Sequence, residues 1–182
     1  MGFKISWLGF SGKNKDEVLK ALNLVDTGVH DEANESPVSV ASIPNGWTIV
    51  WFDQFDHPFS EDKELRPLSM GCTLVAVQVH EGIMFSAAEL YRDGARAWSA
   101  SHDAQQGIYN LHTDGALPHA FEEIRARLTV EQDREGGKDA QVDCIFDIPV
   151  ELAQSICGFR HDRFSFDWGE PIFTEAKEAV VK

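Results

Sequence analysis

Three His-Asp dipeptides are the residues of this sequence whose types could do chemistry together. They are His30-Asp31, His102-Asp103 and His161-Asp162. An imidazole beside a carboxylate can share general acid–base work, and the same two groups can bind a divalent metal ion. Either use requires both side chains to reach one point in space.

The expected positions of these pairs do not favour such a site. His102 follows an expected strand, and His161 follows the end of an expected helix. Adjacent residues on a strand point to opposite faces, so one pair cannot ligate one metal from regular strand geometry. We interpret the pairs as surface turn residues. The alternative is a hydrolase that uses His102, Asp103, His161 and Asp162, if the fold brings the two turns together.

Other catalytic and metal-binding patterns are missing from the sequence. The run HTDGALPH (112–119) has suitable ligand types but matches no metal motif, and no C-x-x-C, G-x-S-x-G, P-loop or G-x-G-x-x-G is present. We therefore expect no metal and no cofactor. The three cysteines, Cys72, Cys144 and Cys157, are too scattered for a disulfide framework, which favours a reducing cytosol.

The charge of the chain narrows the classes of partner. A net charge of −14 argues against nucleic acid and against anionic membrane surfaces, because both attract clustered Lys and Arg. No apolar run approaches the ~18 residues that a membrane span needs, so we expect a cytoplasmic protein. A strongly acidic surface suits either plain solubility or a basic protein partner. We favour a non-enzymatic protein that binds a basic protein.

The run DQFDHPFSED (53–62) is the expected place for that contact, because aromatic and acidic residues alternate there outside a strand. Aromatic side chains can anchor an interface, and charges around them steer association. The expected binding residues are Asp53, Phe55, Asp56, Phe59, Glu61 and Asp62. The alternative is that Phe55 and Phe59 pack back onto the core.

The elements that must position these residues follow from hydrophobic periodicity. Apolar residues at helical spacing predict helices near 14–23, 118–133 and 148–157, with a short one near 60–70 that Ser60 can cap. Period-2 patterns predict a strand at 4–10, a hairpin around Asn45-Gly46 and a meander from 72 to 111. The polar stretch 25–39 is expected to be a loop, and the alternating run 163–168 a strand.

These elements predict one α+β domain over residues 1–182. Its mainly antiparallel sheet should have about five strands with flanking helices, because short Gly-containing turns cannot connect parallel strands. The length agrees with the rough prior of ~150 residues per domain.

The run CIFDIPVELAQSICGFRHDRFSFDWGEP (144–171) resembles the C-terminal part of a family of small uncharacterised bacterial proteins. No activity is assigned to that family, so the resemblance implies a compact α+β domain and no catalytic residues. In size and charge the chain is also similar to immunity proteins that neutralise toxins, which is an analogy only.

Overall fold

A strand of nearly continuous apolar residues lies in the middle of the molecule. In this computed structural model, which describes residues 2–180, β1 (Lys4–Ser11) is buried along most of its length. Ile5 and Trp7 face one hydrophobic core, whereas Leu8 and Phe10 face a second. Both faces of the sheet are therefore covered at its centre, which explains why β1 lacks an apolar–polar alternation.

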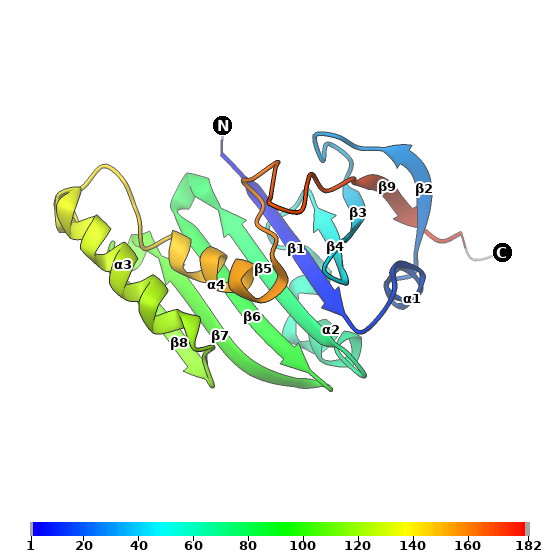
Figure 1. Cartoon of the computed structure of the whole chain (residues 1–182), viewed down its shortest axis with the longest axis horizontal. Helices are drawn as coiled ribbons and strands as arrows, with labels where there is room; N and C mark the ends of the chain where they lie inside the picture. Colours follow the sequence, from blue (N-terminus) through cyan, green and yellow to red (C-terminus); the bar gives the residue numbers. More distant parts are fainter. Residues whose placement is uncertain (1, 181–182) are drawn as a thin grey trace.

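Around β1 the described residues form one antiparallel sheet of nine strands in the order β2-β9-β3-β4-β1-β5-β6-β7-β8 (Figure 1). The other strands are β2 (Leu24–His30), β3 (Val38–Ile43), β4 (Trp47–Phe52), β5 (Thr73–His80), β6 (Phe85–Arg92), β7 (Ala95–Asp103), β8 (Leu111–Gly115) and β9 (Thr174–Glu178). The fold is of the α+β class, but the prediction of about five strands is wrong.

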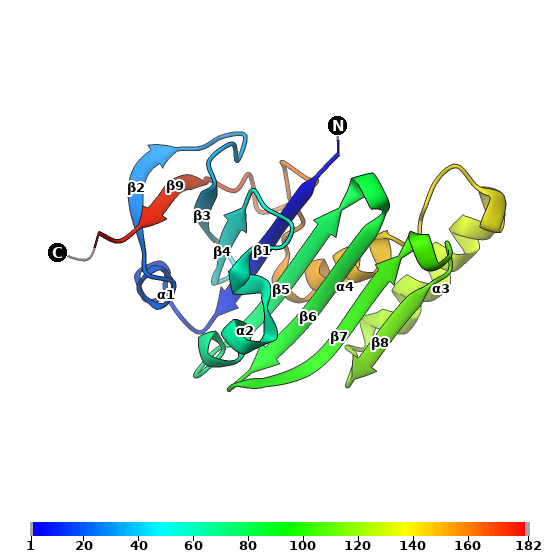
Figure 2. The same ribbon diagram turned by 180° about the vertical axis from the view of Figure 1, so that it is seen from behind.

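Helices lie against both faces of this sheet. The first core lies under α3 (Ala120–Arg134) and α4 (Asp147–Cys157), which cross the sheet in front of β5 to β8 in Figure 1. The second core is covered by α1 (Lys15–Ala21) and α2 (Asp62–Leu68). Figure 2 views the molecule from this opposite face. In residues 2–180 no helix is both long enough and apolar enough to cross a membrane.

The predicted helices are present, with some different caps. Asn14 and Glu17 form a capping box at the start of α1, with bonds of 3.0 and 2.8 Å. The prediction that Ser60 caps α2 is wrong, because Glu61 is the N-cap residue and its side chain makes no capping bond. At α4 the N-cap residue is Phe146, and Asp147 is the first helical residue.

Two segments differ from their predicted structure. The expected loop 25–39 contains most of β2 and the first residues of β3; β2 is mostly exposed and polar, so periodicity does not identify it. The expected strand 163–168 is a tight turn in which Phe166 and Gly169 exchange backbone hydrogen bonds of 2.9 Å. Phe166 and Trp168 stack there at 4.6 Å instead of alternating across a sheet.

Candidate functional site

A hollow of about 600 Å³ lies between the loop that joins β2 to β3 and the segment that joins α4 to β9. We call it the His161 pocket. Its apolar wall consists of Ala33, Phe159, Phe164, Pro171, Ile172 and Phe173. Its polar lining consists of His30, Glu32, Asn34, His161, Arg163 and Glu170.

The end of α4 places His161 on this wall. Gly158 adopts the left-handed conformation with φ of 76° and ends the helix, which turns the chain back. Arg160 then holds the returning segment against α4, because its Nη2 donates to Asp147 Oδ1 at 3.0 Å and to Asp162 Oδ2 at 2.7 Å. The His161 ring packs edge-on against Phe3 at 5.0 Å.

His161 is only 4% exposed, so its interpretation as a surface turn residue is wrong. Burial lowers the pKa of its imidazole to about 4, although the neighbouring Asp162 acts in the opposite direction. The ring is therefore neutral at pH 7 and offers one donor and one acceptor. Neither ring nitrogen has a hydrogen-bond partner among the described residues. An unpaired buried polar group costs about 1–3 kcal/mol.

Asn34 brings a second unpaired polar atom to the same pocket. Its Oδ1 is buried and has no partner in the part of the chain that the structure describes. The backbone here is fixed by Asp31, whose carboxylate accepts from the N–H groups of Glu35 and Ser36 at 2.9 and 3.1 Å. The Asp31 N–H donates to the Phe173 carbonyl at 2.9 Å and so joins the two walls.

His102 is also buried, but its ring has two partners. It lies within β7 rather than in a turn, and its Nε2 is 2.8 Å from Asp143 Oδ2. Its Nδ1 lies 2.6 Å from the Asn110 carbonyl oxygen. Asp103 caps the short helix Ala104–Gln106 by accepting from the Gln105 N–H at 3.0 Å. These contacts tie the end of β7 to the segments before β8 and α4, which is a structural role.

The two candidate His-Asp pairs lie apart. His161 contacts Phe3 before β1, whereas His102 lies on β7, with β5 and β6 between them. Strands are spaced by about 4.8 Å, so three spacings place β1 and β7 roughly 14 Å apart in the sheet. No hydrogen bond or ion pair within residues 2–180 joins them. The two His-Asp pairs that the hydrolase alternative requires at one site therefore do not lie together in the described residues.

A second hollow, of about 590 Å³, opens over the second core on the other face of the sheet. We call it the Phe59 pocket. Its apolar wall includes Leu22, Leu24, Val38, Phe52, Pro58 and Phe59. His57 stacks on Phe52 at 3.9 Å, and burial lowers the pKa of the His57 imidazole. Glu175, Lys177 and Glu178 complete the wall from β9.

The segment 53–62, expected from the sequence to bind a partner, borders this second pocket. Asp53, Asp56 and Glu61 are exposed, and Phe59 is half-buried in the pocket wall. Phe55 is half-buried too and packs edge-on against His80 at 5.3 Å and Phe85 at 5.5 Å. Both rings thus pack onto the molecule, as the alternative interpretation of the sequence states.

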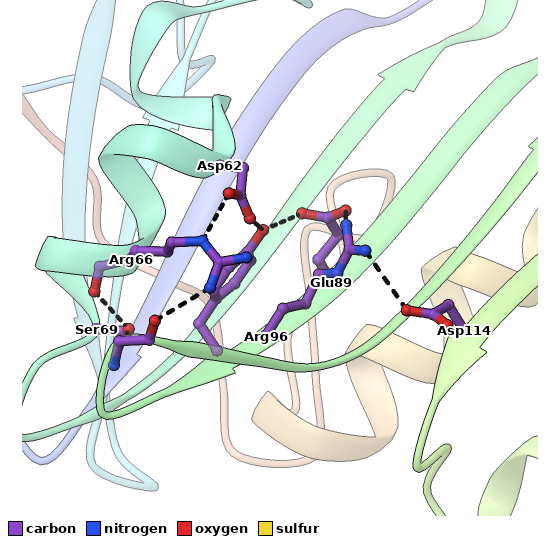
Figure 3. A network of polar contacts seen from close by, with 8 residues as sticks. Asp62, Arg66, Ser69, Glu89, Arg96 and Asp114 are labelled. Carbon is purple, nitrogen blue, oxygen red and sulfur yellow. Dashed lines mark hydrogen bonds and ion pairs between the residues drawn. The ribbon is translucent and has the colours of Figure 1, made fainter.

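Asp62 differs from the other acidic residues of the segment, because it belongs to an internal network. Its carboxylate accepts from Arg66 Nε at 2.6 Å and from the Tyr91 hydroxyl at 2.8 Å. The same hydroxyl lies 2.8 Å from Glu89, and Arg96 bridges Glu89 and Asp114 (Figure 3). Burial and the two carboxylates raise the pKa of Tyr91. These contacts fix α2 to β6 and β7.

Within residues 2–180 no three His, Cys, Asp or Glu side chains form a group that could hold a metal ion. Cys72, Cys144 and Cys157 are free thiols and buried. No protein-family model, curated protein or solved structure matches the chain. The two pockets are therefore candidate sites because of their geometry alone.

Proposed function

We propose that the protein is a non-enzymatic binding protein whose partner is a basic protein. The observation that supports this is the Phe59 pocket near acidic residues. The pocket is lined by His57, Pro58 and Phe59, which lie in the same short segment as the exposed Asp53, Asp56 and Glu61, and β9 contributes Glu175 and Glu178 to its wall. The hollow accepts an apolar anchor side chain, and the carboxylates attract the basic residues around that anchor.

The acidic segment is held in place before any partner arrives. The Asp53 N–H donates to the Pro37 carbonyl at 3.1 Å, and Ser6 Oγ donates to the Gln54 carbonyl at 2.9 Å. Gln78 Nε2 donates to the Phe55 carbonyl at 3.2 Å. A surface that is already ordered loses little conformational entropy on binding, which favours affinity.

The net charge acts over a longer range than these contacts. At −14 the whole molecule attracts a cationic partner and raises the association rate at low ionic strength. The analogy with acidic immunity proteins supports the same kind of partner, a cationic protein that the chain would cover. Such binding weakens as salt screens the exposed charges.

The test is capture of proteins from a native lysate at low and high salt, with mass spectrometry of what is captured. The site variant combines Asp53→Lys, Asp56→Lys and Glu61→Lys. The matched control combines Glu123→Lys, Glu135→Lys and Asp139→Lys, three exposed positions on and after α3. We expect a basic protein to be captured at low salt, to be lost with the site variant and to be retained with the control.

The pocket that receives the anchor is tested separately with Phe59→Ala, which removes an aromatic ring from the pocket wall, in a variant whose melting curve shows that it is folded. We expect at least about a tenfold loss of affinity, since truncation of a central aromatic costs 2 kcal/mol or more at a hot spot. Equal loss of capture with the site and control sets would overturn the placement of the interface. Failure to capture any basic protein at low salt would overturn the function.

A further inference from the structure

The His161 pocket has the features of a second, separate binding site. It lies against the first core, whereas the Phe59 pocket lies against the second. It therefore does not depend on the proposed contact with a basic protein. Its volume of about 600 Å³ falls in the range of ≈ 300–1,000 Å³ that is usual for small-molecule sites.

Buried polar atoms without partners distinguish this pocket from an ordinary surface hollow. Buried polar groups in folded proteins nearly always have a hydrogen-bond partner, so unpaired ones need a specific reason. Here the imidazole of His161 and the amide oxygen of Asn34 are both unpaired among the described residues, and both residues line the one pocket. Together they offer a donor and two acceptors.

The charges around the pocket indicate what kind of ligand fits. Arg160, the cation next to His161 in the chain, is 5% exposed and is committed to Asp147 and Asp162. Arg163, Glu32 and Glu170 are exposed lining residues with both signs represented. A charged ligand group placed at His161 would have no buried counter-ion, and its desolvation would be costly.

From these observations we infer that the His161 pocket binds an uncharged small molecule with an apolar ring and an amide-type polar group. The ring lies against the apolar wall that includes Phe159, Ile172 and Phe173. The amide carbonyl accepts from the His161 N–H, and an amide N–H donates to Asn34 Oδ1. Each polar atom of the ligand then satisfies one of the unpaired atoms of the protein.

Three probes of the same shape and different charge test this inference. Benzamide is neutral, benzoate carries a negative charge, and benzamidine carries a positive charge. Each is titrated into the uniformly ¹⁵N-labelled full chain, and the ring resonances of His161 are followed by NMR, with His161→Phe identifying them. We expect benzamide to shift the His161 ring resonances, and the two charged probes to bind at least about tenfold more weakly.

Variants separate a built site from weak surface binding. Asn34→Gly removes the amide oxygen and keeps a residue that adopts the φ of 52° found at Asn34 without strain. We expect both Asn34→Gly and His161→Phe to weaken benzamide binding by about tenfold or more, the effect of one lost hydrogen bond to a buried group. His112→Gln, at an exposed position on β8, serves as the control and should bind benzamide as the natural chain does.

Two results would overturn the inference. One is a His161 ring whose nitrogen shifts already show hydrogen bonding and do not move with benzamide up to its solubility limit, because water then fills the pocket. The other is equal binding of the neutral and charged probes. If His161→Phe does not fold, Asn34→Gly and the comparison of the three probes still decide the question.

Discussion

Gly115 and Gly28 both adopt a positive φ, at 81° and 72°, but only at Gly115 would a side chain meet the backbone of a neighbouring strand. A Cβ at Gly115 would be 2.2 Å from the Ala97 oxygen, whereas a Cβ at Gly28 would meet nothing within 4 Å. We expect Gly115→Ala to lower the free energy of unfolding by about 3 kcal/mol, and Gly28→Ala by about 1 kcal/mol. Urea denaturation of both variants measures the difference. Equal losses would show that backbone conformation alone matters at Gly115.

His161 should make the stability of the protein depend on pH. Its pKa is about 4 in the folded chain and about 6.5 in the unfolded chain, so below pH 6.5 the unfolded chain binds the additional proton. The stabilisation is fully present above pH 6.5 and is lost as the pH falls toward 4. The total is about 3 kcal/mol, from 1.36 kcal/mol for each unit of pKa difference.

Denaturation curves between pH 7 and pH 4 check this expectation. His161→Phe should flatten the curve of stability against pH in that window, and His112→Gln should leave its shape unchanged. The lowered pKa values of Asp31 and Asp162 act in a lower window, because their stabilisation is lost only below the usual carboxyl range. If the free energy of unfolding of His161→Phe depended on pH as steeply as that of the natural chain, the expectation that His161 is buried and neutral would be wrong.

At the scale of elements, Arg160 fixes the segment after α4 to the helix itself. Its side chain is 6% exposed, and it pairs with Asp147 and Asp162. Removing one partner of a buried ion pair leaves uncompensated charge, so Arg160→Met should lower the free energy of unfolding by about 3–5 kcal/mol. The control is Arg127→Met on α3, since Arg127 pairs with Glu151 but is 51% exposed; it should cost at most about 1 kcal/mol.

Thermal or urea denaturation compares the two arginine variants directly. The same variants also test the His161 pocket, because Arg160 holds the segment that carries His161. We expect Arg160→Met to broaden or shift the His161 ring resonances, and Arg127→Met to leave them in place. Equal destabilisation by the two substitutions would show that Arg160 is no more than a surface ion pair.

Elements with a strong apolar pattern could be predicted from the sequence, and elements without one could not. The α4 helix shows helical periodicity and a terminal Gly158, and β4 follows a turn with Asn45-Gly46, so both were predictable. In contrast, β2, β8 and β9 each have at most one buried residue, and they form because neighbouring backbone groups pair with them. Pairing of that kind depends on residues distant in the sequence.

The residues of the candidate sites also divide into those that could be predicted from the sequence and those that could not. His161 was visible as a residue type, but its burial depends on the reversal after Gly158 and on Arg160 folding back to α4. Nothing in the sequence around Asn34 indicates a binding residue, since it lies in a polar stretch. Its place in the pocket depends on the contact between Asp31, in the same loop, and Phe173, which precedes β9. The acidic character of 53–62 was readable, whereas the apolar hollow next to it required the tertiary structure.

For the whole molecule, the charge of −14 sets how stability responds to salt. Like charges repel in the compact state, and salt screens that repulsion. At pH 7 we expect the melting temperature to rise by about 2–4 °C between ~10 and ~150 mM NaCl, which for this chain length corresponds to roughly 1 kcal/mol. Differential scanning calorimetry measures the shift.

The control for this expectation is the same salt series near the isoelectric point. The sequence pI is about 4.8, where the net charge is close to zero and salt has little repulsion to screen. The rise should therefore be much smaller there. A melting temperature that falls with salt at pH 7 would mean that surface ion pairs outweigh the net repulsion.

The position of β9 has a consequence for how the chain is made. This strand pairs with β2 on one side and β3 on the other, although it is synthesised almost 150 residues after β2. While the nascent chain emerges from the ribosome, β3 presents an unpaired edge until residues 174–178 arrive. Such an edge can pair with other chains, and a contact of this sequence separation forms slowly. The arrival of β9 thus ends the period in which the edge of β3 is open to pairing with other chains.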